Sequence, residues 1–188
     1  MIICGIDEAG RGPLAGPVVV AGVIMKKTLK IEGIKDSKRL TFLKRENLFQ
    51  QITENALYYE IQIIDEKIID DINILRSCMK GMESVMDKFR DKCDKYLIDG
   101  NYLKFRDDRH VDYNYETIVK GDDKVYEISC ASILAKVIRD RIMIESDTVY
   151  PEYGFKNHKG YGTKKHIEAI LNYGPCNIHR TTFLKNIF

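Results

Sequence analysis

Acidic residues follow apolar runs at three separate places in this sequence. Asp7 and Glu8 come after the first run, Asp99 after the second and Asp122 after the third, and a glycine lies within two residues of each group. In α/β sheets, ligand sites gather at the ends of the core strands. At any one position the alternative is an acid that only begins a turn. Three positions of the same type favour one site at which the four carboxylates converge.

Four converging carboxylates would form a site for divalent metal ions. Without cations they would raise one another's pKa values and could not all stay ionised. Oxygen ligands and four negative charges match two Mg²⁺ or Mn²⁺ ions, and two ions about 3.5–4 Å apart are the usual arrangement for in-line attack on a phosphodiester. Neighbours in a strand point to opposite faces. Asp7 and Glu8 can therefore share a site only if the strand ends or is distorted there, which Ala9-Gly10 permits.

Glycine-rich and basic segments elsewhere could hold a phosphorylated substrate. Gly10-Arg11-Gly12 offers a backbone that a ligand can approach closely and a cation for phosphate, although such a tripeptide is often only a turn. Asp36-Ser37-Lys38 and Ser132 would add phosphate contacts, unless the first is an ordinary capping turn. Lys159 and Tyr161, in a glycine-flanked loop, could contact a sugar or a base. The alternative there is a surface turn with the Tyr161 ring packed down.

Composition and charge limit the class of protein. The 188 residues are 44% hydrophobic and 31% charged with a formal net charge of +2, which excludes a disordered chain and a histone-like polycation. Residues 151–188 hold six Lys or Arg and two acids, so that a local basic surface is expected there. The longest apolar stretch, Val18–Met25, is too short to span a bilayer. Five cysteines without a C-x-x-C pair indicate reduced thiols, no zinc site and a cytoplasmic protein.

Strand-like and helical patterns mix along the chain, which indicates one α/β domain over residues 1–188 with a basic C-terminal part from 151 onward. Short β-branched runs predict strands at Ile2–Ile6, Pro17–Met25, Leu57–Ile64, Tyr96–Ile98 and Thr117–Val119, the first two as a hairpin. Apolar residues at helical spacing predict helices at Thr41–Ala56, Asn73–Arg90 and Ser129–Glu145, and a last helix capped by Thr163 and ended by Gly174. Most other acids, Asp70 among them, are expected to solvate helix faces.

Six segments, in order across nearly the whole chain, resemble the motifs of ribonuclease HII. They are GIDEAGRGPLAGPVVVAGVI at 5–24, DSKRL at 36–40, LIDGN at 97–101, VKGDDKVYEISCASILAKVIRD at 119–140, YGFKNHKGYGT at 153–163 and HRTTF at 179–183. The first and the fourth are long and highly specific, and together the segments look most like the bacterial form. Departures are small: Cys130 stands where that family usually has alanine, and Tyr126 where it often has proline.

The resemblance implies an RNase H-like fold, a central five-stranded mixed sheet flanked by helices with extra helices at the C-terminus. It implies an endonuclease that cuts RNA hybridised to DNA, or a single ribonucleotide in duplex DNA, in replication and repair. Cleavage 5′ to the ribonucleotide by two metal ions would leave a 3′-hydroxyl and a 5′-phosphate. The implied site comprises the metal ligands Asp7, Glu8, Asp99 and Asp122, the 2′-hydroxyl sensor Gly10-Arg11-Gly12, and Tyr161 on the sugar at the RNA–DNA junction.

Partners and rival functions follow from the same residues. Ribonuclease HIII shares similar motifs but carries an extra N-terminal domain, and only six residues precede Asp7 here. The chain ends soon after HRTTF without a clear clamp-binding motif, so a sliding-clamp partner is unsupported and a monomer is expected. A non-catalytic nucleic-acid-binding module would not need the four acids, which repel DNA in the absence of metal. A phosphatase or DNA-only nuclease would use the acids but would not need a 2′-hydroxyl sensor.

Overall fold

The computed structural model describes residues 1–188 apart from 29, 35–39, 104–112, 186 and 188. Within the described residues, five strands form one mixed sheet in the order β3-β2-β1-β4-β5. Their bounds are β1 (Ile3–Ala9), β2 (Val18–Met25), β3 (Ala56–Ile64), β4 (Lys95–Asp99) and β5 (Tyr115–Ile118). The first three strands in the chain pair antiparallel, whereas β4 runs parallel to both β1 and β5. The predicted α/β class with a five-stranded mixed sheet is confirmed.

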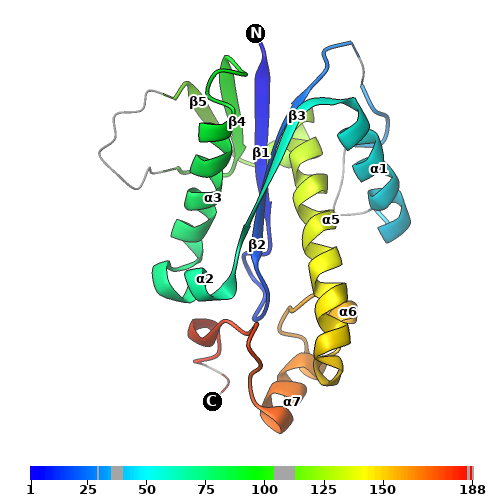
Figure 1. The fold of residues 1–188 in the computed structure, drawn as a ribbon, viewed down its shortest axis with the longest axis vertical. Coiled ribbons are helices and arrows are strands. Elements are labelled where there is room, and N and C mark those ends of the chain that lie inside the picture. Colours follow the sequence, from blue (N-terminus) through cyan, green and yellow to red (C-terminus); the bar gives the residue numbers. More distant parts are fainter. Residues whose placement is uncertain (29, 35–39, 104–112, 186, 188) are drawn as a thin grey trace.

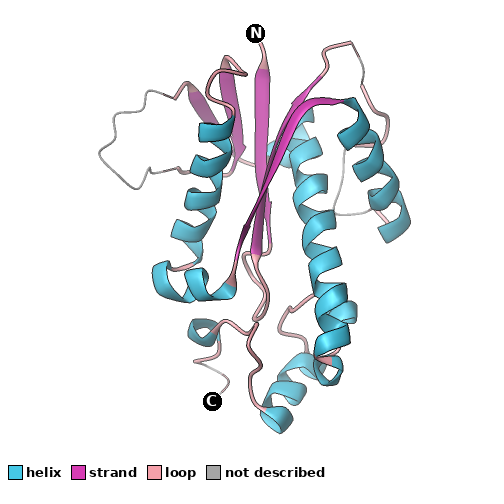
Figure 2. Ribbon diagram, in the orientation of Figure 1, coloured by secondary structure: helices cyan, strands magenta, loops and turns pink. Residues whose placement is uncertain are grey.

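Helices cover both faces of this sheet (Figure 2). Their bounds are α1 (Phe42–Asn55), α2 (Glu66–Ile72), α3 (Ile74–Lys88), α4 (Gly121–Lys124), α5 (Tyr126–Val149), α6 (Phe155–His158) and α7 (Lys164–Tyr173), with short 3₁₀ turns at Pro151–Tyr153 and Thr181–Phe183. Side chains alternate between faces along a strand, so Val18 and Val20 pack with α3 while Val19 and Ala21 pack with α5 and α1. All eight residues of β2 are buried for that reason, and its sequence is one continuous apolar run.

The C-terminal part of the chain lies beyond the end of the sheet at which β1 stops (Figure 1). Phe155, Ile170 and Leu184 form a third apolar cluster there, together with Ala15 of the loop between β1 and β2. Backbone hydrogen bonds tie the same loop to this part, from Arg180 N–H to the Leu14 carbonyl and from Leu14 N–H to the Gly160 carbonyl, each 2.8 Å. The loop after β1 is therefore held between the sheet and the C-terminal part.

Several element predictions are confirmed and others need correction. Thr163 caps α7 as expected, and Thr41, predicted only as the first residue of a helix, caps α1; each accepts a hydrogen bond from a backbone N–H in the first helical turn. The third predicted helix is longer than Ser129–Glu145, because α5 runs over 24 residues from Tyr126 to Val149. The short helix α2 has no counterpart among the predicted elements, since seven residues give too little periodicity to recognise. No helix of the described residues is long and apolar enough to cross a membrane.

Asp70, on α2, does more than solvate a helix face. Its carboxylate accepts hydrogen bonds from the backbone N–H and the hydroxyl of both Thr181 and Thr182. Burial alone would raise the pKa of Asp70, but these four hydrogen bonds outweigh burial and lower it. The expectation for Asp70 was therefore wrong: this acid docks the end of the chain onto α2.

Candidate active site

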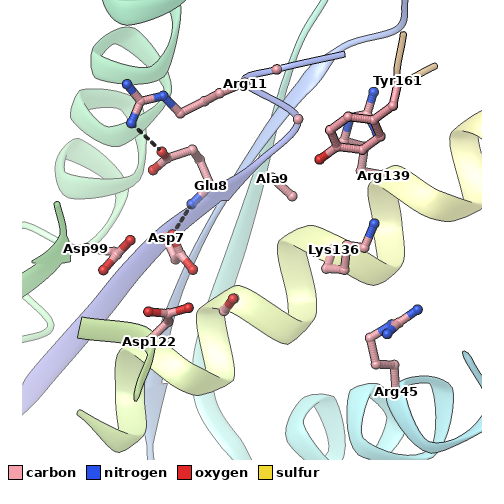
Figure 3. Close-up of a pocket in the computed structure, with 13 residues that line it drawn as sticks. Asp7, Glu8, Ala9, Arg11, Arg45, Asp99, Asp122, Lys136, Arg139 and Tyr161 are labelled. Carbon is pink, nitrogen blue, oxygen red and sulfur yellow. Dashed lines mark hydrogen bonds and ion pairs between the residues drawn. The ribbon is translucent and has the colours of Figure 1, made fainter. Parts of the chain in front are cut away.

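A cavity of about 380 Å³ lies at the end of β1, and all four predicted metal ligands line it. Asp7, Glu8, Asp99 and Asp122 lie at one end of this cavity in Figure 3, and Arg45, Lys136 and Arg139 lie at the other. The cavity thus has an acidic end and a basic end. The acidic end collects side chains from β1, β4 and α4, which are far apart in the sequence and which the parallel pairing of β1 with β4 brings together.

The strand β1 neither ends before Asp7 nor is interrupted there, contrary to the condition derived from the sequence. It continues through both acids to Ala9 and stays paired with β2. On its other side the paired register with β4 stops at Ile6 and Ile98. Beyond that point no described strand pairs with this edge of β1, so that Asp7 on the α5 face and Glu8 on the α3 face reach the same cavity around it. An open strand edge, not a distorted strand, allows the two neighbours to share the site.

Asp99 and Asp122 are positioned by the turn that follows β5. The Asp99 Oδ1 atom accepts a hydrogen bond of 2.7 Å from the backbone N–H of Gly121. A Cβ atom on Gly121 would lie 2.6 Å from the Ile128 Cδ1 atom and 3.3 Å from the Asp99 Oδ1 atom, so a larger residue would require these side chains to shift. Lys120 adopts a left-handed conformation, φ 56°, which ends the extended chain. Asp122 therefore lies in the single helical turn α4 and not at a strand end, and its exposed fraction is only 4%.

The environment of the first two acids disfavours their charged forms. Burial raises the pKa of Asp7 well above its usual value, and the charges of Glu8 and Asp99 raise it further. Hydrogen bonds from the Ser132 hydroxyl and from the Glu8 backbone N–H act in the opposite direction without cancelling this rise. The pKa of Glu8 is also raised, chiefly by burial, although the Arg11 guanidinium 3.3 Å away opposes the shift.

The donor set fits a hard divalent cation. All four side chains offer carboxylate oxygens, and the buried Oε2 atom of Glu8 has no hydrogen-bond partner within the described part of the chain. A buried acceptor without a partner costs free energy, and a cation would supply the missing interaction. Among the described residues, however, no three Asp, Glu, His or Cys side chains lie close enough, as placed, to chelate one ion. Binding would therefore require side-chain rotations that draw the carboxylates together.

Two buried arginines donate to backbone carbonyls, five of them in the loop between β1 and β2 and one in the C-terminal part. Arg180 donates to the carbonyls of Gly16, Arg11 and Gly10, at 2.9, 3.0 and 2.6 Å respectively. Arg139, from α5, donates to those of Pro17, Lys159 and Ala15, at 3.0, 2.9 and 3.1 Å respectively. The exposed fraction is 0% for Arg180 and 1% for Arg139. Desolvation lowers the pKa of each guanidinium to about 10.

The sequence placed Arg180 in the basic C-terminal surface, which is wrong because Arg180 is fully buried, and it assigned no role to Arg139, although one signal was present. Arg139 follows Ala131 and Ala135 at intervals of four and precedes Met143 at the same interval, so it lies on a buried stripe of α5. A cation within an apolar helical stripe indicates a buried charge with a specific partner. Nothing comparable marks Arg180, whose position depends entirely on where the C-terminal segment docks.

The two glycines of the predicted sensor differ in what they require. Gly10 has φ +104°, and a Cβ atom there would lie 2.2 Å from the Arg139 Nε atom. A Cβ atom on Gly12 would have only ordinary contact, 3.7 Å from the Tyr161 ring. Gly10 is therefore needed by the fold, whereas the absence of a side chain at Gly12 leaves the cavity accessible. Arg11 and Tyr161 line the same cavity.

Tyr161 is 45% exposed, which contradicts a ring packed down onto the surface. Its backbone carbonyl lies 2.9 Å from the His166 Nδ1 atom, and the His166 Nε2 atom lies 3.0 Å from the His179 Nε2 atom. Because the Cys176 N–H donates to His179 Nδ1, His179 carries its proton on Nε2 and donates to His166. The proton of His166 is then on Nδ1 and is donated to the Tyr161 carbonyl. Two neutral histidines thus anchor the rim of the cavity.

The remaining predicted contacts have mixed outcomes. Ser132 lines the cavity, where its hydroxyl interacts with Asp7. Lys159 is not among the described residues that line the cavity, and its ammonium group donates to the Lys156 carbonyl. Ser37 and Lys38 lie outside the described residues. Arg45 and Lys136, which line the basic end, are absent from the sequence-based predictions.

Comparison with known proteins identifies the family. A family model described as ribonuclease HII matches residues 4–186. The ribonuclease HII of Francisella philomiragia is 53% identical over 183 residues, which cover 97% of this chain and 96% of the relative. That of Caldicellulosiruptor bescii is 49% identical over 185 residues, which cover 98% of this chain and 87% of the relative.

Solved structures give the same fold. The ribonuclease H2 of Pyrococcus horikoshii matches with a TM-score of 0.79 and 28% identity, covering 100% of this chain and 97% of that one. The RNase HII of Archaeoglobus fulgidus, from its complex with PCNA, gives a TM-score of 0.80 at 24% identity over 96% and 94% of the two chains. Bst-RNase HIII in complex with Mn²⁺ gives 0.69 at 17% identity over 93% and 63%. The last two likenesses concern the fold alone. With the family model and both relatives spanning nearly the whole chain, this protein belongs to the ribonuclease HII family and is a ribonuclease H with an RNase H-like fold.

Proposed function

We propose that this chain is an endonuclease that hydrolyses the phosphodiester 5′ to a ribonucleotide, both in RNA–DNA hybrids and at single ribonucleotides in duplex DNA. The products are a 3′-hydroxyl and a 5′-phosphate, and the role is ribonucleotide removal in replication and repair. One observation carries the proposal: the four carboxylates share one cavity with the glycine loop and with Tyr161. Metal ligands and a candidate ribose sensor thus lie within reach of a single nucleotide.

Asp7, Glu8, Asp99 and Asp122 are the proposed ligands of two divalent ions, Mg²⁺ or Mn²⁺. When bound, such ions lower the pKa of a coordinated water and stabilise the leaving 3′-oxygen. The carboxylates themselves would hold the ions through hard oxygen donors, which suit Mg²⁺ and Mn²⁺. The raised pKa values of Asp7 and Glu8 support this role, because a nearby cation would restore the ionised forms that burial disfavours.

Ribose recognition is assigned to the loop Gly10-Arg11-Gly12. The Arg180 guanidinium occupies the carbonyls of Gly10 and Arg11, so these peptide units are fixed and cannot rotate to present their oxygens to the cavity. The backbone N–H groups near Gly12 are then the donors available to a 2′-hydroxyl, which is the group that distinguishes RNA from DNA. Tyr161 beside Gly12 would pack on the adjoining sugar.

Other aspects of the protein are proposed from the family match and the cysteines. One catalytic domain over residues 1–188 agrees with the family match to residues 4–186. A cytoplasmic location agrees with the free thiols of the five cysteines, and the proposed oligomeric state is a monomer. A sliding-clamp partner is not proposed for this chain. A DNA-only nuclease is disfavoured because the glycine loop at the cavity would then have no ribose to recognise.

The decisive experiment compares two substrates. Duplex DNA with one ribonucleotide and an all-DNA duplex of the same sequence are incubated with Mg²⁺ or Mn²⁺. We expect one incision, 5′ to the ribonucleotide, and an intact control duplex. Equal cutting of both duplexes would favour the general nuclease, and no incision of either would remove the proposal.

Metal binding has a readout that does not depend on activity. Mg²⁺ or Mn²⁺ should raise the melting temperature of the wild-type protein, because a ligand that binds only the folded state stabilises it. Asp122→Asn should reduce that rise. Asp123→Asn, one residue along on the same helical turn but exposed, is the matched control and should behave like wild type. An equal rise in all three proteins would exclude Asp122 as a ligand.

A further inference from the structure

We propose that Arg45 and Lys136, at the basic end of the cavity, form a subsite for a backbone phosphate of the duplex, separate from the phosphate that is cleaved. This inference rests on the proposed nucleic-acid substrate. Figure 3 shows both side chains on the side of the cavity away from the four carboxylates. Arg45 comes from α1 and Lys136 from α5, so the subsite bridges two helices.

A buried carboxylate holds the two cations in place. The Lys136 Nζ atom lies 2.7 Å from Asp140 Oδ1, and an Arg45 Nη2 atom lies 3.7 Å from Asp140 Oδ2. Asp140 is only 3% exposed and is not among the described residues that line the cavity, whereas both cations are. The carboxylate therefore stands behind the cations as seen from the cavity. Two positive charges against one negative charge leave a surplus facing the cavity.

The hydrogen-bonding capacity of these cations is not exhausted. The Arg45 Nε atom is buried without a partner among the residues that the structure describes, and one Nη atom donates to the Leu40 carbonyl. A guanidinium can bind a phosphate through two parallel N–H donors, and an ammonium can bind one as a point charge. A phosphate in the cavity would bind these cations, and a rotation of the Arg45 side chain would bring the buried Nε donor, unpaired among the described residues, within its reach.

A third cation lies within electrostatic reach. Burial lowers the pKa of Lys159, and the positive charges of Lys136 and Arg45 lower it further, while Asp140 acts in the opposite direction. Three like charges around one carboxylate repel one another, and an added anion would relieve that repulsion. This supports an anion site beside Asp140 and gives Lys159 an indirect part in it.

The alternative is a purely structural ion pair that joins α1 to α5. The two interpretations predict different effects on duplex binding when Asp140 is replaced. If the cations serve only to satisfy Asp140, replacing Asp140 weakens the fold and brings no gain in binding. If they serve phosphate, Asp140→Asn removes the competing internal anion and should strengthen duplex binding.

The test measures binding of a ribonucleotide-containing duplex to the full chain by fluorescence anisotropy. A chelator is present so that nothing is cleaved. The salt concentration is varied from about 50 to about 300 mM, the range over which phosphate contacts weaken. Lys136→Gln and Arg45→Gln should each reduce the slope of log K against log salt by about 0.9. Asp140→Asn should bind more tightly than wild type at the lowest salt concentration.

Arg141→Gln is the matched control. Arg141 also joins α5 to α1, through Glu46 at 2.5 Å, but is not among the described residues that line the cavity. It should lose the helix–helix ion pair without any change in the salt slope. Thermal melts identify any variant that fails to fold. If Arg45→Gln fails to fold, Lys136→Gln still tests the subsite, because the Lys136 side chain is one-third exposed and its replacement should be tolerated.

An unchanged slope in folded Lys136→Gln, or weaker binding by folded Asp140→Asn, would overturn the subsite. Failure of the proposed function gives a different pattern. In that case the ribonucleotide is not incised when metal is present, yet the slopes still change because duplex binding without metal does not depend on cleavage.

Discussion

The carboxylates of the acidic end and the buried arginines Arg139 and Arg180 are charges of opposite sign that differ in how far their hydrogen bonds are satisfied. At the acidic end, Asp7 and Glu8 have raised pKa values, and the Glu8 Oε2 atom has no partner in the described ranges. On the C-terminal side, Arg139 and Arg180 donate to six backbone carbonyls between them. A buried charge is tolerated when its hydrogen bonds are satisfied and is costly when they are not.

This difference distinguishes the arginines, which hold the site in shape, from the carboxylates, which are the candidates for binding a cation. Each arginine donates to three backbone carbonyls, and five of these six carbonyls lie in the loop between β1 and β2, so both arginines are positioning residues. At the acidic end the Glu8 Oε2 atom lacks a hydrogen-bond partner among the described residues, which fits a group that binds a cation in the working enzyme. Burial alone does not distinguish these cases, because Asp7, Asp122, Arg139 and Arg180 are all nearly inaccessible.

The largest expected effect concerns the acidic end. Asp122→Asn should lower the rate of ribonucleotide cleavage on the order of 10³-fold or more, because a lost metal ligand removes several kcal/mol of transition-state stabilisation. Single-turnover cleavage measures the rate, and Asp123→Asn is the control. A reduction of less than tenfold would mean that Asp122 is not a metal ligand. The acidic end would then differ less from the buried arginines than we propose.

Arg180→Met tests the contribution of a buried arginine to stability. It leaves the carbonyls of Gly10, Arg11 and Gly16 without their donors, at roughly 1 kcal/mol for each lost hydrogen bond, so the free energy of unfolding should fall by about 3 kcal/mol. Urea denaturation measures this loss. The exposed Arg76→Met is the control and should stay within about 0.5 kcal/mol of wild type. Equal stability of the two variants would show that the hydrogen bonds from Arg180 to the three carbonyls contribute nothing to the free energy of unfolding.

Gly12→Ala should affect recognition and leave the fold intact. The added methyl group meets only the Tyr161 ring at ordinary contact distance, so stability should change by less than about 0.5 kcal/mol. Incision at the ribonucleotide should fall roughly tenfold, the equivalent of about 1.4 kcal/mol of lost interaction. Melting curves and cleavage assays together check this, and unchanged cleavage would remove Gly12 from the ribose contact.

Asp7 and His166 should make the free energy of unfolding depend on pH in opposite directions. The folded-state pKa of Asp7 is raised, so in metal-free protein its ionisation is unfavourable above the unfolded value near 3.9. Asp7→Asn should therefore be more stable than wild type at neutral pH, and the difference should shrink as the pH falls towards 4. Thermal melts of the two proteins across this range measure it. A constant difference would indicate an effect other than ionisation.

His166 should give the reverse dependence. Desolvation is the main cause that lowers its pKa to about 4, whereas the unfolded side chain protonates near 6.5. The stability that neutral His166 provides is present above about 6.5 and is lost as the pH falls towards 4. His166→Gln should flatten that part of the stability profile, and an unaltered profile would show that His166 does not titrate in this range.

Much of the fold could be predicted because local patterns are strong where packing is regular. The apolar run of β2, the threonine caps of α1 and α7, and the periodic face of α3 each indicate their element without tertiary information. The short helix α2 and the docking role of Asp70 could not be predicted. Seven residues carry little periodicity, and the threonines that Asp70 binds are 111 and 112 positions further along the chain.

The order of residue types alone specifies which groups can do the chemistry: four acids beside glycines, and motifs that resemble one family along nearly the whole chain. How those acids meet depends on the folded arrangement. Asp7 and Glu8 share the cavity because β4 stops pairing with β1 at Ile98 and leaves an open edge, which requires a parallel pairing between distant segments. The buried arginines and the basic pair around Asp140 likewise depend on long-range packing. No local pattern specifies which carbonyl or carboxylate a distant cation will meet.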